Sequence, residues 1–238
     1  MPGNRHEDEF DRELEGWAAA RPDAQVSPET RIRIHNKLSA SLVPVNPIPS
    51  VKSLTLILFL VFAVCAGSLI TIGDKAGFRL MTGRQMLIMA AVLVAGGVIF
   101  SFSLACRMVP GSRPGFPMAL ALMFWGAGMI GGIALLFPWR NSTAFVSEGW
   151  PCAVTELSIA LAAAALFWVL AQRGALFPDA DLGAALVGLS SALALLVLQF
   201  RCMFQNVLHL FVWHVLTAAV LIGTGALAAR FYRGRRIH

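Results

Sequence analysis

The side chains best suited to chemistry in this sequence are its four cysteines and two of its histidines, which lie in or beside long apolar stretches. They are Cys65, Cys106, Cys152, Cys202, His209 and His214. Thiolates and imidazoles are ligands that soft and borderline metal ions prefer, and two thiols can also form a disulfide. Because no CxxC pair and no closely spaced Cys/His motif occurs, the spacing by itself identifies no metal or cofactor.

Six apolar runs must position these side chains. They cover residues 54–72, 86–106, 116–137, 152–171, 182–200 and 207–231. Each is close to the ~20 residues that a helix needs to cross a bilayer. The chain is 57% hydrophobic and only 13% charged, which is typical of membrane proteins. The sequence therefore predicts an all-α fold, a polytopic membrane bundle of six transmembrane helices with a short helical cytoplasmic N-terminal region.

The predicted domain boundary follows residue 50. Residues 51–238 are expected to form the transmembrane domain with its basic C-terminal tail, and residues 1–50 a partner-binding region that ends in a Pro-rich linker. No segment between the apolar runs is long enough for a soluble catalytic domain, so we expect no enzymatic activity. The N-terminus lacks the apolar stretch of a cleavable signal peptide, so the first membrane helix is expected to direct targeting.

Positive charge predicts that both termini face the cytoplasm. In that orientation ten Lys and Arg residues near the membrane lie inside and five lie outside, as the positive-inside rule requires. The inner set is Arg33, Lys37, Lys52, Arg107, Arg113, Arg173, Arg230, Arg233, Arg235 and Arg236, and the outer set is Lys75, Arg79, Arg84, Arg140 and Arg201. The net charge of +6 is therefore attributed to membrane orientation, and no direct nucleic-acid binding is expected.

The predicted topology separates the cysteines by depth in the membrane. Cys152 and Cys202 both lie at the outer ends of spans, where the compartment outside a bacterial inner membrane is oxidising and a disulfide is chemically allowed. If one helix held Cys202 and His209, the two would share a face about 10 Å apart along its axis. His214 is about 140° around a regular helix from His209, so the two histidines are not expected to bind one metal ion.

Several interpretations of these polar groups remain open. The histidines could be structural, each bonded to a carbonyl or a neighbouring side chain. Cys152 and Cys202, together with His209, could form a redox sensor or a sensor of thiophilic metals. A third interpretation is a haem site or a transport path, which His209, His214 and Glu156 would line.

Glu156 is the one acidic residue inside the predicted spans, and it follows Cys152 by one helical turn. From its depth we expect it to pair with Arg201 or Arg140 at the outer interface. The lack of further carboxylates in the spans disfavours a proton-coupled transporter, which usually needs a relay of such groups.

The N-terminal region is predicted to contain two short amphipathic helices. Ser27 is a suitable N-cap for the second, with Pro28 at the first helical position. Helices of this size do not form a stable core alone, so their apolar faces need a cover, or they remain loosely folded and solvated. A partner protein is a better candidate than the membrane surface for the first helix, whose polar face is acidic. The apolar positions are Phe10, Leu14, Trp17, Ile34, Leu38 and Leu42.

In layout the chain resembles the NrsF-type anti-sigma factors, six-span bacterial inner-membrane proteins with a short cytoplasmic N-terminus. The resemblance rests on the helix at 27–42, the segment LVPVNPIPS at 42–50, the spacing from Cys152 to Cys202, and FRCMFQNVLHLFVWH at 200–214. It implies that residues 1–50 sequester an extracytoplasmic-function sigma factor. It also implies that Cys152 and Cys202 match the family's paired cysteines, which are linked to sensing oxidants or heavy metals. With His209 and His214 added, these residues are the expected signal-sensing set.

Overall fold

The computed structural model describes residues 27–41, 49–73, 75–112, 115–140, 143–174 and 179–235. The chain divides into two compact units, residues 1–47 and 48–238. Of the predicted partner-binding positions, Phe10, Leu14, Trp17 and Leu42 lie outside the described residues, as does the side chain of Leu38.

The first unit contains helix α2 (Pro28–Ser41). It begins where the sequence predicts, because the hydroxyl oxygen of Ser27 accepts a hydrogen bond of 3.2 Å from the backbone N–H of Thr30. Its described side chains are all exposed. They include Ile32 and Ile34, which are 61% and 49% exposed. Helix α2 therefore presents apolar side chains that a partner could cover.

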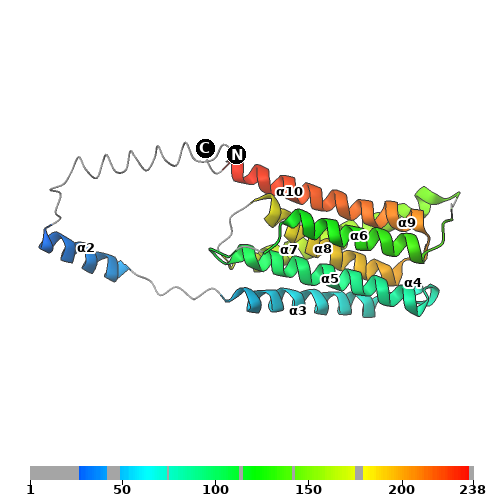
Figure 1. Ribbon diagram of the computed structural model, residues 1–238, viewed down its shortest axis with the longest axis horizontal. Helices are drawn as coiled ribbons and strands as arrows, with labels where there is room; N and C mark the ends of the chain where they lie inside the picture. The colour runs from blue at the N-terminus through cyan, green and yellow to red at the C-terminus, as the bar shows by residue number, and fades with distance from the viewer. Residues whose placement is uncertain are drawn as a thin grey trace. The chain divides into compact units, whose positions relative to one another are not determined.

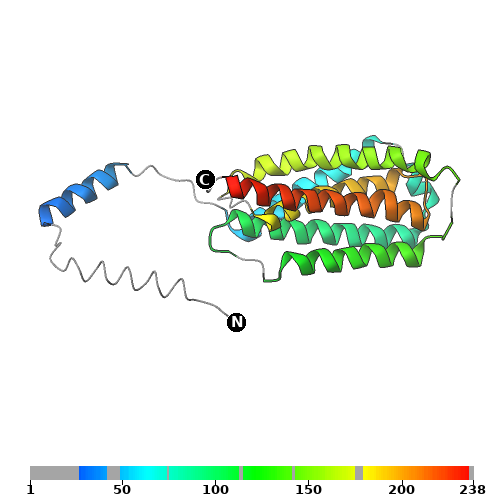
Figure 2. The same cartoon turned by 90° about the horizontal axis from the view of Figure 1, so that it is seen from above.

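The second unit is a bundle of six long helices that run alternately up and down (Figures 1 and 2). They are α3 (Val51–Ile72), α5 (Gly83–Met108), α6 (Met118–Leu136), α7 (Phe145–Ala171), α8 (Ala180–Arg201) and a sixth made of α9 (Val207–Leu210), the π-helix η1 (Phe211–Leu216) and α10 (Thr217–Arg235). All six are long and apolar enough to cross a membrane. The predicted all-α, six-span fold is confirmed, and the protein is a multi-pass membrane protein.

Two elements differ from the predicted boundaries. Helix α7 begins at Phe145, seven residues before the predicted start at Cys152, so part of the expected 138–151 loop is helical. This segment contains Glu148, Gly149 and Pro151, residues that usually mark loops, but an acidic residue in a first helical turn is favoured by the helix dipole. A further short helix, α4 (Ala76–Leu80), lies in the loop after α3.

Helix α8 is the central helix of the bundle and packs against α3, α5, α7 and α10. From Leu182 to Gln199 nearly every residue is buried. The helix starts at Asp179, whose carboxylate accepts a 2.7 Å hydrogen bond from the backbone N–H of Leu182. At the same end Arg107 of α5 forms ion pairs with Asp179 and Asp181. Helix α8 therefore connects this end of the bundle to the opposite end, where Cys202 is its C-cap.

Candidate functional site

Three segments meet at the end of the bundle where α3 finishes at Ile72 (Figure 1). They are the first turns of α7, the C-terminal end of α8 and the beginning of the sixth span. Between them they carry Cys152, Cys202, His209 and His214, whose sulfur and ring-nitrogen atoms all lie within 4.8 Å of one another. We call these four residues the Cys/His cluster. It contains every residue of the expected signal-sensing set.

The contacts within the Cys/His cluster are short. The Sγ atoms of Cys152 and Cys202 are 3.8 Å apart. The Sγ atom of Cys202 is 3.4 Å from Nε2 of His209, and the rings of His209 and His214 have centroids 5.4 Å apart. Three of the four residues are buried, whereas Cys152 is partly exposed. The cluster is therefore enclosed, with one thiol within reach of the surface.

A turn at residues 202–206 replaces the continuous helix considered from sequence. The backbone N–H of Cys202 closes α8 with a 2.8 Å bond to the Leu198 carbonyl, and the Gln205 amide donates a 2.7 Å bond to the Cys202 carbonyl. Asn206 then caps α9 by accepting a 2.9 Å bond from the His209 N–H. The separation of about 10 Å, which holds only if one helix contains both residues, does not apply, because the chain turns here and brings Cys202 Sγ to 3.4 Å from His209 Nε2.

The expectation that His209 and His214 lie on different faces is also wrong. It assumed a regular α-helix, but the residues from Phe211 to Leu216 form a π-helix. A π-helix bonds residue i to residue i+5, so its turn is wider than that of an α-helix. His209 lies in α9 and His214 in η1, and the wider turn of η1 brings the His214 ring to 5.4 Å from that of His209.

Aromatic side chains close the site. The ring of Phe204 lies 5.2 Å from that of His209, and the ring of Phe145 lies 5.6 Å from that of Trp213. Trp213 packs directly on Gly149, where any Cβ atom would overlap the indole. Gly149 is therefore required for the close approach of α7 to η1 beside the cluster.

The electrostatics of Cys202 follow from its surroundings. Its hydrogen bond with Cys152, together with burial, raises the pKa of the Cys202 thiol above its ordinary value.

Glu156 lies one helical turn from Cys152 and is fully buried. Neither of its carboxylate oxygens has a hydrogen-bond partner within the described part of the chain. The predicted pairing with Arg201 or Arg140 is wrong. The Arg201 guanidinium instead donates a 2.6 Å bond to the carbonyl oxygen of Leu69, at the end of α3.

Replacing Glu156 with leucine is expected to stabilise the metal-free protein by about 1–3 kcal/mol, the usual penalty for a buried polar group without a partner. The measurement is thermal unfolding in detergent with a chelator present. Glu148→Leu, on the same helix at a partly exposed position, is the matched control and should change stability little. A lower unfolding midpoint for Glu156→Leu would contradict the absence of a partner.

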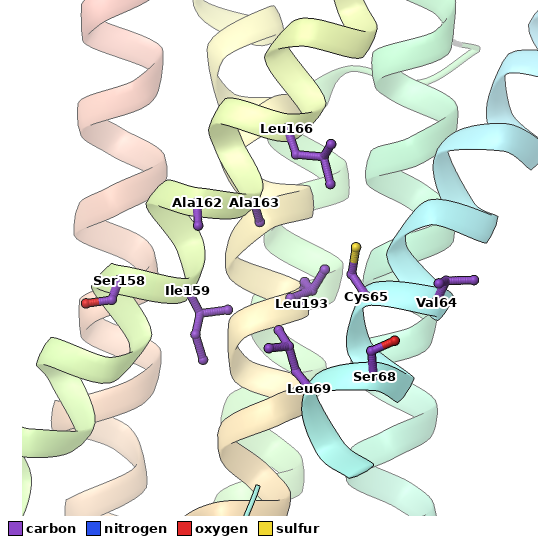
Figure 3. A pocket seen from close by; sticks show the side chains of 10 residues that line it. All are labelled: Val64, Cys65, Ser68, Leu69, Ser158, Ile159, Ala162, Ala163, Leu166 and Leu193. Carbon is purple, nitrogen blue, oxygen red and sulfur yellow. The ribbon is translucent and has the colours of Figure 1, made fainter. Parts of the chain in front are cut away.

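The other two cysteines lie elsewhere. Cys106 is buried near the C-terminal end of α5, at the opposite end of the bundle. Cys65 lies on α3 and lines a groove of about 500 Å³ with residues of α7 and with Leu193 of α8 (Figure 3). Both positions are consistent with the predicted separation of the cysteines, and both provide control sites for thiol chemistry.

Comparison of the chain with protein-family models, with curated proteins and with solved structures finds no match in any of the three. The fold and the site define a six-span membrane protein with a buried Cys/His cluster at one end of its bundle.

Proposed function

We propose that the protein is a membrane-bound anti-sigma factor. In this proposal residues 1–50 sequester an extracytoplasmic-function sigma factor, and the six-span bundle holds it at a bacterial inner membrane with both termini in the cytoplasm. A signal received at the Cys/His cluster then releases the sigma factor. The observation that carries the proposal is the convergence of two thiols and two imidazoles in one buried cluster. Such a cluster suits signal reception, and in the described residues no second group of this kind occurs.

The N-terminal unit supports the partner-binding part of the proposal. Helix α2 exposes Ile32 and Ile34, and amphipathic helices commonly bind partners through such apolar positions. Positive charge supports the orientation, since ten basic residues near the membrane lie on the proposed inner side and five on the outer side. The cluster then faces the outer compartment, where oxidants and metal ions arrive first.

Two kinds of signal fit the thiols. In oxidation by a peroxide, Cys152 and Cys202 give up two electrons and two protons, the S–S bond forms, and the peroxide O–O bond breaks to yield two water molecules, or one alcohol and one water from an organic hydroperoxide. In metal binding, both thiols lose their protons and become ligands. Either event changes how α7 is held against the end of α8.

Co-purification tests the partner. The full chain, purified in detergent, is expected to retain an extracytoplasmic-function sigma factor encoded in the same genome. Ile34→Asp should weaken that binding about 30-fold, as loss of about 2 kcal/mol at an apolar anchor does. Asn36→Asp, an exposed polar position on the same helix, is the matched control. Failure of the full chain to retain any such sigma factor would overturn the proposal.

A transport path is the second candidate, favoured by the buried, unpartnered carboxylate of Glu156, one helical turn from Cys152 of the cluster. A chain lacking residues 1–47 separates the two functions. It should lose repression of the sigma factor if the protein is an anti-sigma factor. A transporter would keep its ion flux, measured in proteoliposomes, after the same deletion.

A further inference from the structure

We infer that Cys152, Cys202, His209 and His214 form a four-ligand site for one thiophilic divalent cation of the zinc group. This inference rests on the proposed function, because it specifies the signal that the cluster receives. Binding of the cation can nevertheless be tested without the sigma factor.

The separations in the cluster match a tetrahedral site. With metal–sulfur bonds of about 2.3 Å and tetrahedral angles, two sulfur ligands lie about 3.8 Å apart. The Sγ atoms of Cys152 and Cys202 are 3.8 Å apart. A sulfur and a nitrogen ligand of one zinc ion lie about 3.6 Å apart, and Cys202 Sγ is 3.4 Å from His209 Nε2. These two pairs therefore need little movement to accept the ion, and the remaining ligand atoms, all within 4.8 Å of one another, need to move by about 1 Å at most to reach the separations of a tetrahedral zinc site.

A disulfide would use only part of the cluster. The Sγ separation of 3.8 Å is the contact distance of two unbonded thiols and is compatible with either reaction, but a disulfide would involve neither histidine. His214 is buried, and its Nε2 atom has no hydrogen-bond partner in the described ranges of the chain. A buried imidazole nitrogen without a partner is costly unless a ligand completes it.

Charge selects the class of cation. Two thiolates carry two negative charges and two neutral imidazoles carry none, so a divalent ion gives a complex with no net charge. A monovalent or trivalent ion would leave a net charge in a buried site, which is costly. Sulfur and imidazole ligands favour zinc and its heavier relatives over magnesium or calcium, which prefer oxygen.

The cation would add metal–ligand bonds between three segments that are otherwise joined here by packing and by hydrogen bonds of Cys202 to Cys152 and His209. Cys152 belongs to α7, Cys202 ends α8, and the histidines belong to α9 and η1. The partly exposed Cys152 gives the ion access from the surface.

Titration of the purified full chain with Co²⁺ tests the inference, after treatment with a chelator and under reducing conditions. We expect one Co²⁺ per chain, a thiolate-to-cobalt charge-transfer band and the intense visible bands of tetrahedral cobalt. Zn²⁺ should displace the cobalt and abolish these bands. Absence of the bands, or the weak spectrum of octahedral cobalt, would overturn the inference.

Variants test the ligand set. Cys202→Ser and His214→Ala should each weaken binding by at least about 100-fold, since loss of even an outer-shell group costs 10–100-fold. Cys106→Ser and His35→Ala remove the same residue types outside the cluster and should bind as the wild type does. An unchanged affinity and spectrum in His214→Ala would refute the four-ligand site.

Loss of binding through misfolding is distinguished by a conservative replacement. Cys202→His supplies a different ligand and should restore a tetrahedral spectrum with a weaker charge-transfer band. Failure to restore it in a protein with the wild-type unfolding midpoint would count against the site. If the chain retains the sigma factor but binds no Co²⁺, only the metal-site inference fails. If the chain binds Co²⁺ but retains no sigma factor, the metal site stands and the proposed function fails.

Discussion

Gly183→Leu is expected to destabilise the bundle by about 3 kcal/mol or more, because it inserts a side chain where two helix backbones touch. A Cβ atom at Gly183 of α8 would lie 2.8 Å from the carbonyl carbon of Gly225 and 2.9 Å from Cβ of Ala229, both on α10. Backbone atoms cannot rotate away as a flexible side chain can, so α10 must separate from α8. Small residues at helix contacts in membranes serve this close approach.

The matched control is Gly223→Leu, on α10, where a Cβ atom meets nothing within 4 Å. Its effect on stability should be small. The measurement is thermal unfolding in detergent, monitored by the reaction of a thiol-specific fluorophore with the buried Cys106 as it becomes exposed, in a protein whose Cys65, Cys152 and Cys202 are replaced by serine. Equal unfolding midpoints for the two leucine variants would show that α8 and α10 do not pack as described.

On the proposed anti-sigma function, the double variant Cys152→Ser, Cys202→Ser is expected to abolish release of the sigma factor by Cd²⁺ or by peroxide in cells. Without the thiols neither a metal complex nor a disulfide can form, so the repressed state persists. Induction of a sigma-dependent reporter should fall from at least about tenfold to none. A tenfold induction corresponds to a change of about 1.4 kcal/mol, caused by the signal, in the equilibrium between sequestered and released sigma factor.

The control for this experiment is the double variant Cys65→Ser, Cys106→Ser, which removes the two cysteines that lie outside the cluster. It should respond as the wild type does. Membrane levels of each variant must be equal. A normal response in the Cys152→Ser, Cys202→Ser variant would remove the cluster from signalling, whatever metal the purified protein binds.

The fold can be predicted from sequence because the length and apolar composition of each span identify it as a membrane helix. The incorrect predictions concern one helix boundary and one side-chain contact. The start of α7 was missed because Glu148, Gly149 and Pro151 resemble a loop, although tertiary packing of Gly149 on Trp213 favours a helix there. Glu156 was paired by depth alone, which cannot tell that Arg201 already bonds the end of α3.

The site was only half predictable. Topology places Cys152 and Cys202 at one depth, but the approach of His214 depends on the wider turn of η1, in which residue i bonds to residue i+5. Nothing in the pattern of apolar residues marks a π-helix. The one cue to this pair in the sequence is the five-residue spacing of His209 and His214. That spacing fits a helix turn bonded from i to i+5, but it places the two side chains on different faces when a regular α-helix is assumed.

Helix α8 joins the Cys/His cluster to the ion pairs of Arg107 without a break. Because nearly every residue from Leu182 to Gln199 is buried against neighbouring helices, α8 resists bending along its length. We therefore expect a displacement of Cys202 along the helix axis to move Asp179 and Asp181 as well, and so to disturb their ion pairs with Arg107.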